Sequence, residues 1–138
     1  MSILKAGETG VYVAAKATDD DIWTDGVNIY YSAGADQYVL DKETKTWSTI
    51  TWTGLTSFYG NHVWTDGTNY YFSYDTSHYK LDVNTKTWLS VQWNHSNFDG
   101  DDIFRVGTKI FYLRNGYLYE INTETYIFSE LTSEFTGS

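Results

Sequence analysis

Short runs of aromatic and aliphatic residues alternate with polar turn residues along the whole chain. In residues 78–82, Tyr79 and Leu81 share one face of an extended segment, whereas His78 and Lys80 share the other, which is the period of a β-strand. No segment shows the period of a helix. The pattern therefore predicts an all-β protein whose strands, each about four to seven residues long, are joined by tight turns.

The strand pattern recurs three times, in residues 20–52, 61–93 and 101–131. Equivalent positions are spaced by 41 and then 40 residues, as in the sets Trp23, Trp64, Phe104; Trp47, Trp88, Phe128; and Tyr38, Tyr79, Tyr119. A fixed period of about forty residues indicates a symmetric array of supersecondary units, such as a propeller. Each repeat would then be one four-stranded blade.

The second repeat defines the expected blade most clearly. Its strands are expected at residues 62–65, 69–73, 78–82 and 87–93, with Asp66-Gly67 forming the first turn. Applied to the whole chain, the repeat predicts five segments: an N-terminal arm or closure strand (1–19), three blades (20–60, 61–100 and 101–132) and a tail (133–138).

One motif within the repeat is similar to the kelch repeat of galactose-oxidase-type propellers. An aromatic, an apolar residue and an Asp precede a turn that ends in Thr-x-x-Trp, as in Tyr38, Leu40, Asp41, Thr44 and Trp47. The second repeat matches it and the third matches more loosely. The resemblance implies that Asp41 and Asp82 cap the turn and that Trp47 and Trp88 pack on a neighbouring blade. The glycine pair that closes the second kelch strand is absent, and the period is nearer to that of WD40 propellers.

Three blades are too few to close a ring, because propellers use roughly four to eight. We expect two chains to associate as a homodimer, so that three four-stranded blades form half of a six-bladed β-propeller. The segment 9–13 reads as a strand that either pairs with the partner as a closure strand or stays on its own chain. A β-trefoil, which also has three repeats but closes within one chain, is the alternative fold.

Composition restricts the partners. The 138 residues carry a formal net charge of −9, with 9 basic and 18 acidic side chains, which argues against nucleic acid and anionic membranes. Cys is absent, so thiolate metal sites and the Cys–Tyr chemistry of galactose oxidase are excluded. No signal peptide or transmembrane segment is recognised, and the expected location is cytoplasmic or virion-associated.

Aromatic residues are concentrated in the connections between repeats. Beside Asn and Asp, such side chains could form a platform for a carbohydrate or a peptide. The alternative is that they cover the seams between blades. The candidate ligand-binding residues are Trp52, Phe58, Tyr59, Trp93, His95 and Phe98.

Acidic residues begin the first strand of two repeats. Equivalent positions would converge at one mouth of the channel, where carboxylates suit Ca²⁺ or Mg²⁺, although the sequence favours the simpler interpretation, a hydrated acidic rim. The weak metal candidates are Asp20, Asp21, His62, Asp101 and Asp102.

No catalytic constellation or metal-binding spacing is recognised, so the sequence favours a non-enzymatic binding or assembly module without a resident cofactor, such as a viral or phage structural protein or a carbohydrate-binding protein. One alternative is a cation-dependent enzyme acting on a sugar or phosphate at the acidic mouth. The other is a fragment of a longer natural or engineered propeller.

Overall fold

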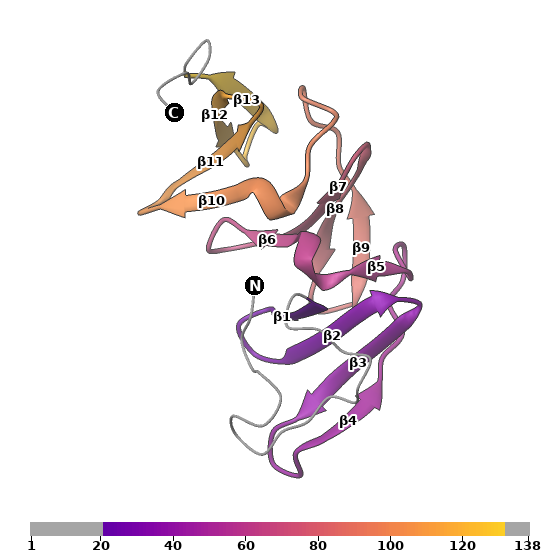
Figure 1. Cartoon of the computed structure of the whole chain (residues 1–138). Coiled ribbons are helices and arrows are strands. Elements are labelled where there is room, and N and C mark those ends of the chain that lie inside the picture. The colour runs from indigo at the N-terminus through magenta and orange to yellow at the C-terminus, as the bar shows by residue number, and fades with distance from the viewer. Residues whose placement is uncertain (1–20, 132–138) are drawn as a thin grey trace. The chain divides into compact units, whose positions relative to one another are not determined.

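The computed structural model describes residues 21–131 and confirms the all-β prediction (Figure 1). Each repeat forms one sheet of four antiparallel strands that follow one another in chain order. The first sheet contains β1 (Ile22–Thr24), β2 (Ile29–Gly34), β3 (Asp36–Asp41) and β4 (Thr46–Thr49). The second contains β6 (Val63–Thr65), β7 (Tyr70–Tyr74), β8 (Ser77–Asp82) and β9 (Thr87–Ser90). The third contains β10 (Ile103–Val106), β11 (Lys109–Arg114), β12 (Tyr117–Asn122) and β13 (Ile127–Glu130).

The connections between sheets contain short elements of their own. The two-residue strand β5 (Phe58–Tyr59) pairs with β2, and one-turn 3-10 helices at Gly60–His62 and Gly100–Asp102 lead into β6 and β10. The predicted arm and closure strand, together with Asp20 and the predicted tail, lie outside the described residues. No helix within residues 21–131 has the length and apolarity that crossing a membrane requires.

The last strand of the second repeat is shorter than predicted, because β9 ends at Ser90 rather than Trp93. After Ser90, one more ladder-like bond joins the Val91 N–H to the His78 carbonyl at 2.9 Å, and the chain then leaves the sheet. Trp93 is therefore placed by the connection that follows the sheet. Equivalent bonds from Ile50 to Gln37 and from Leu131 to Leu118 end the other two sheets in the same way.

A side-chain cap holds the turn between the last two strands of each repeat. Asp41 accepts hydrogen bonds from the N–H groups of Glu43 and Thr44 at 2.9 and 3.2 Å. The Thr44 and Glu43 N–H groups hold the pKa of Asp41 below its usual value. Asp82 and Asn122 accept the equivalent bonds, so the capping role that the kelch resemblance implied is confirmed.

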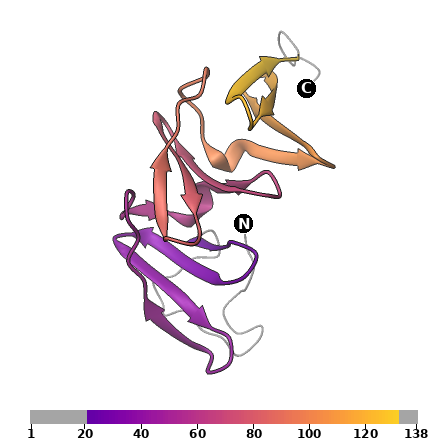
Figure 2. The same cartoon turned by 180° about the vertical axis from the view of Figure 1, so that it is seen from behind.

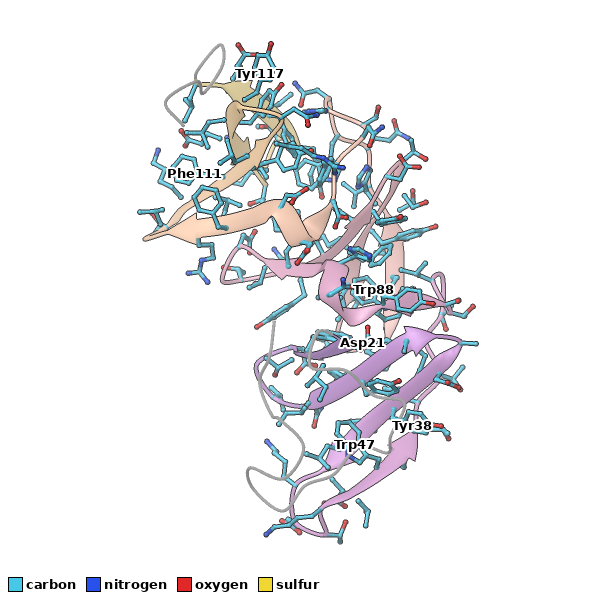
Figure 3. The ribbon with its side chains drawn as sticks, in the orientation of Figure 1. Asp21, Tyr38, Trp47, Trp88, Phe111 and Tyr117 are labelled. Carbon is cyan, nitrogen blue, oxygen red and sulfur yellow. The ribbon has the colours of Figure 1, made fainter. Side chains whose placement is uncertain are left out.

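Strand register divides each sheet into two faces, since paired residues of an antiparallel ladder share a face and neighbours along a strand alternate. We call the face that carries Trp23 and Tyr30 the forward face, and the opposite one the rear face. The rear face of the first sheet carries Tyr38 and Trp47 (Figure 3). In the third sheet the forward face carries Phe104 and Phe111, and the rear face carries Tyr112, Tyr119, Ile121 and Phe128.

The described residues divide into two compact units. Figure 2 shows the strands of the three sheets from behind. Among the described residues, the first unit combines residues 21–63 with Asp82–Trp88, and the second combines Trp64–Leu81 with residues 89–131. Three four-stranded antiparallel sheets are compatible with both predicted architectures, the propeller and the trefoil. The consecutive order of the four strands within each sheet is that of a propeller blade.

The connection after the first sheet runs beside the start of β9. The Thr53 N–H donates to the Lys86 carbonyl at 3.0 Å, and the Trp88 N–H donates to the Thr53 carbonyl at 2.8 Å. The next residue, Gly54, has a φ of +90°, and a Cβ there would overlap the Trp88 carbonyl oxygen. Only glycine therefore fits this position.

We expect Gly54→Ala to lower the free energy of unfolding by more than the same change at Gly34. Gly34 also has a positive φ (+66°), but its Cβ would lie 3.5 Å from the nearest atom, so only the strain of about 1–2 kcal/mol applies. Urea denaturation of the two variants measures the difference. Equal losses would contradict the close approach of Gly54 to Trp88.

Candidate functional site

Five aromatic side chains form a buried cluster in the first unit, the first aromatic cluster: Trp23, Tyr30, Trp52, Phe58 and Trp88. Trp23 stacks on Tyr30 with ring centroids 4.5 Å apart. Trp88, which belongs to the last strand of the second repeat, lies 5.9 Å from both Trp23 and Trp52 and 5.2 Å from Phe58. Trp88 therefore packs against the forward face of the preceding repeat, as the kelch resemblance implied (Figure 3).

The second unit repeats the arrangement one blade later, with Trp64, Tyr71, Trp93, Phe98 and Phe128 as the second aromatic cluster. Trp64 stacks on Tyr71 at 4.4 Å, and Phe128 lies 4.7 Å from Phe98 and 5.7 Å from Trp93. In both clusters, a Trp–Tyr pair on one sheet is covered by two aromatics of the connection and one from the next repeat. The cluster is thus the unit by which one repeat packs on another.

Two polar pairs satisfy the Trp and Tyr that stack on each other in each cluster, whereas the indole Nε1 atoms of Trp52 and Trp88 in the first cluster are buried without a partner. The indole N–H of Trp23 donates to the hydroxyl of Ser32 at 2.9 Å, and Trp64 donates to Ser73 at 3.0 Å. The hydroxyl of Tyr30 donates to Asp25 at 2.7 Å, and Tyr71 donates to Asp66 at 3.1 Å. Burial and the neighbouring carboxylate raise the pKa of both tyrosines, so they remain protonated donors.

The third repeat replaces both polar pairs by apolar ones. Phe104 and Leu113 stand where the other repeats have Trp and Ser, and Val106 and Phe111 stand where they have Asp and Tyr. Phe104 still stacks on Phe111, with centroids 5.7 Å apart. However, Phe104 is 43% exposed, Val106 61% and Leu113 43%, whereas Trp23 is 1% exposed and Trp64 6%. We call the four apolar residues of the third repeat the open face: Phe104, Val106, Phe111 and Leu113.

Most of the predicted ligand-binding aromatics lie inside the two clusters rather than on a surface platform. Trp52, Phe58, Trp93 and Phe98 are all buried. This burial fits the alternative reading of the connections, in which their aromatics cover the seams between repeats. Tyr59 is exposed on β5, and His95 is half-buried.

The weak metal candidates are not brought together among the described residues. Asp21 and His62 belong to the first unit, and Asp101 and Asp102 to the second. Asp102 makes an ion pair with Arg114 at 3.3 Å. Within residues 21–131, no three His, Cys, Asp or Glu side chains are grouped so that they could share an ion. The calcium or magnesium site stays a prediction.

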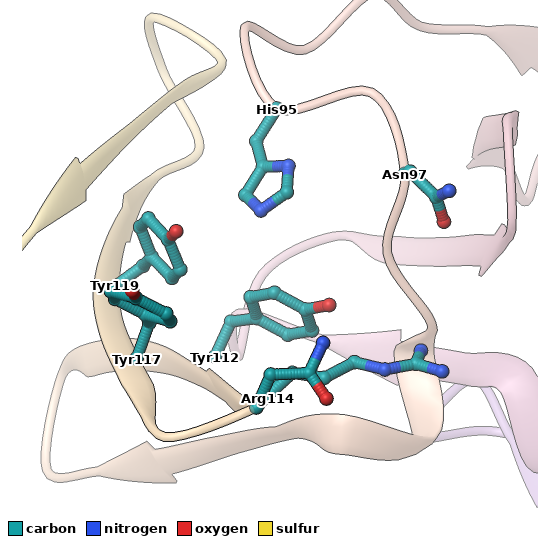
Figure 4. Close-up of a pocket in the computed structure, with 7 residues that line it drawn as sticks. His95, Asn97, Tyr112, Arg114, Tyr117 and Tyr119 are labelled. Carbon is teal, nitrogen blue, oxygen red and sulfur yellow. The ribbon is translucent and has the colours of Figure 1, made fainter. Parts of the chain in front are cut away.

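His95 instead lines a pocket of about 370 Å³ on the rear face of the third sheet (Figure 4). The other lining residues are Asn97, Tyr112, Arg114, Asn115, Tyr117 and Tyr119. The His95 ring stands edge-on to Tyr119 and Tyr112, at 4.9 and 5.6 Å between ring centroids. Burial lowers the pKa of His95, so the ring is neutral at pH 7.

The sequence analysis did not identify Arg114, Tyr117 and Asn97 as site residues. For Arg114 and Tyr117, a comparison of the three repeats could have indicated them. Arg114 stands where the other repeats have Ala33 and Tyr74, and Tyr117 stands where they have Asp36 and Ser77. Neither residue type is therefore required by the blade.

No protein-family model matches this chain, and no curated protein matches it either.

We expect Trp88→Ala to destabilise the protein by about 3–5 kcal/mol, because the substitution empties the centre of the first aromatic cluster. The adjacent Leu89 is exposed, and Leu89→Ala should change the stability by less than about 0.5 kcal/mol. Chemical denaturation of both variants provides the comparison. Unchanged stability of Trp88→Ala would show that this side chain is not the centre of a packed seam.

His78 ties the second connection to its sheet. Its ring stacks on Phe98 at 4.0 Å, and its Nε2 donates to the Ser96 carbonyl at 2.6 Å. Burial lowers the pKa of His78 below its usual 6.5, against the opposing effect of those bonds and of Asp75. The unfolded chain then binds the proton more readily, so the contribution of His78 to stability is complete above about pH 6.5 and is lost as the pH falls below it.

The variant His78→Gln carries the residue that the first repeat has at this position, Gln37, whose amide reaches the Phe58 carbonyl. We expect the melting temperature of the native protein to fall between about pH 7.5 and 5.5, and that of His78→Gln to fall less, because the amide does not titrate there. Thermal scans across this range test the expectation. Identical pH dependence of the two proteins would exclude His78 as a source.

Proposed function

We propose that this chain is a non-enzymatic assembly module of kelch-like blades, in which a second copy covers the open face. The observation that carries the proposal is the contrast between the three forward faces. Two are covered by aromatics of the following repeat, whereas the third exposes Phe104, Val106 and Leu113. An exposed group of adjacent apolar side chains on a protein surface is typical of an interaction site.

The side chain that would cover the open face can be identified from the repeat. Each closed cluster receives the aromatic of the next repeat's last strand, Trp88 in the first and Phe128 in the second. Trp47 is the equivalent residue of the first repeat, and it belongs to neither cluster. We therefore propose that Trp47 of a second copy packs on Phe104 and Phe111, as Trp88 packs on Trp23.

The apolar character of the open face supports this partner. Buried Trp23 and Tyr30 need Ser32 and Asp25 as hydrogen-bond partners, whereas the side chains of Phe104, Val106, Phe111 and Leu113 have no polar group and need none. If each copy covers the open face of the other, the head-to-tail contact is made twice and closes by rotation. Six blades result, which lies within the roughly four to eight that propellers use.

The cation-dependent enzyme remains the alternative proposal, although within residues 21–131 no three His, Cys, Asp or Glu side chains are grouped so that they could share an ion. A longer propeller would cover the open face with a further blade of the same chain. That alternative differs from self-assembly in one measurable respect, since the 138-residue protein by itself would not form a closed pair.

We expect sedimentation velocity of the protein to give a species of about twice the 15.9 kDa of one chain. Phe104→Asp places a charge in the open face and should yield a monomer that melts as a folded protein, because Phe104 is already half-exposed in one chain. Val27→Asp, at an exposed apolar residue of the first turn, is the control and should remain dimeric.

Mixing two variants tests whether Trp47 is the side chain that is received. Trp47→Ala and Phe104→Asp should each be monomeric, but an equimolar mixture should form heterodimers, since one chain retains an intact open face and the other an intact Trp47. A stable wild-type monomer would overturn the proposal. A wild-type dimer whose two variants fail to complement each other would show that the copies instead join through the same face on both chains.

A further inference from the structure

The pocket around His95 is built by two rigid supports within the second unit. On one side, Asn115 and Gly116 both have positive φ angles, 54° and 82°, and form the two-residue turn between β11 and β12. This turn fixes Arg114 and Tyr117 as the last residue pair of the hairpin. On the other side, the connection 91–102 carries His95 and Asn97 over the rear face of the third sheet (Figure 4).

The lining residues divide into those that the blade requires and those that it does not. Tyr112 and Tyr119 correspond to Tyr31 and Tyr38 of the first sheet, and both pairs of rings lie 5.9 Å apart. These tyrosines are part of the repeat. Arg114, Tyr117, His95 and Asn97 have no counterpart of the same type in the other repeats. A set of residues that packing does not explain is therefore gathered around one hollow.

The chemistry of the pocket restricts the class of ligand. Its walls combine tyrosine rings with two carboxamides, a guanidinium and a half-buried imidazole, and no carboxylate is among the lining residues. Cations therefore lack a hard oxygen ligand set. The guanidinium of Arg114 is already paired with Asp102 at 3.3 Å, so its charge is partly compensated. The chain's net charge of −9 further disfavours an anion.

We propose that this pocket binds a neutral oligosaccharide. Tyr117, 37% exposed at the rim, offers a ring face for the apolar side of a sugar ring. Asn97, Asn115 and Arg114 offer planar donors, and the two amides also offer acceptors, which suits the adjacent hydroxyls of a sugar. The half-exposed side chain of Arg114 has five N–H donors, more than its bond to Asp102 uses.

This site is independent of the assembly proposed above. Tyr112, Arg114, Tyr117 and Tyr119 lie on the rear face of the third sheet, whereas Phe104, Phe111 and Leu113 lie on the forward face. Figure 3 shows Tyr117 and Phe111 at separate places on that sheet. All lining residues come from one compact unit of one chain, so a monomeric variant retains the complete pocket.

The test uses the full chain on an array of immobilised neutral glycans, including cello-, manno- and galacto-oligosaccharides, beside polygalacturonate and sialyllactose as acidic probes. The neutral glycan with the strongest signal is then titrated by calorimetry. We expect Tyr117→Ala and Asn97→Ala each to weaken its binding about tenfold, with unchanged melting temperatures. Tyr59→Ala, at an exposed tyrosine of the first unit, is the matched control and should bind as the native protein does.

Phe104→Asp, which alters the forward face, should also retain full binding, so failure of assembly and failure of glycan binding are distinguished. Absence of binding to every neutral glycan would overturn the proposal, as would binding to the acidic probes alone. A neutral glycan whose affinity is unchanged by Tyr117→Ala and Asn97→Ala, but lost in Tyr59→Ala, would place the site on the first unit instead.

Discussion

An aromatic side chain from the last strand of one repeat, packed on a Trp–Tyr pair of the preceding repeat, is the interaction on which the rest of this structure depends. A single four-stranded blade has two broad faces and cannot bury both of them by itself. Trp88 covers the forward face of the first repeat and Phe128 covers that of the second, each together with two aromatics from the connecting segment. The Trp–Tyr pair of each of these two repeats has its own hydrogen-bond partners, a Ser and an Asp, whereas the indole Nε1 atoms of Trp52 and Trp88 are buried without one.

The need to satisfy buried polar groups also explains the substitutions in the third repeat. Both members of each polar pair are replaced. At the positions of the Trp donor and the Ser acceptor, the third repeat has Phe104 and Leu113. At the positions of the Tyr donor and the Asp acceptor, it has Phe111 and Val106. Replacing both members of a pair avoids leaving a donor or acceptor alone in a buried seam. A face that is to remain in water has no such requirement. The substitutions therefore support a partner for this face.

The pocket on the rear face of the third sheet combines residues that are part of the repeat with residues that are particular to the third repeat. Tyr112 and Tyr119 are supplied by the blade pattern, and the turn at Asn115-Gly116 presents Arg114 and Tyr117 at fixed positions. Residues that differ between repeats can vary there without loss of packing, because the blade does not use them. Assembly and ligand binding can thus occupy opposite faces of one sheet.

The sequence by itself determined the all-β class, the three repeats and the positions of most strands, and the resemblance to the kelch repeat implied the capping role of Asp41 and Asp82. These features are local, since they follow from alternation over a few residues and from turn chemistry that recurs at a fixed spacing. Only the tertiary structure decided which aromatics are buried. The sequence left two readings open for the aromatics of the connections, a ligand platform or a cover for the seams. The structure buries four of them in the seams: Trp52, Phe58, Trp93 and Phe98. The pocket is a second case. The connection supplies His95 and Asn97, and the β11–β12 hairpin supplies Arg114 and Tyr117. The contact between these two segments depends on how the chain packs, which no local sequence pattern encodes.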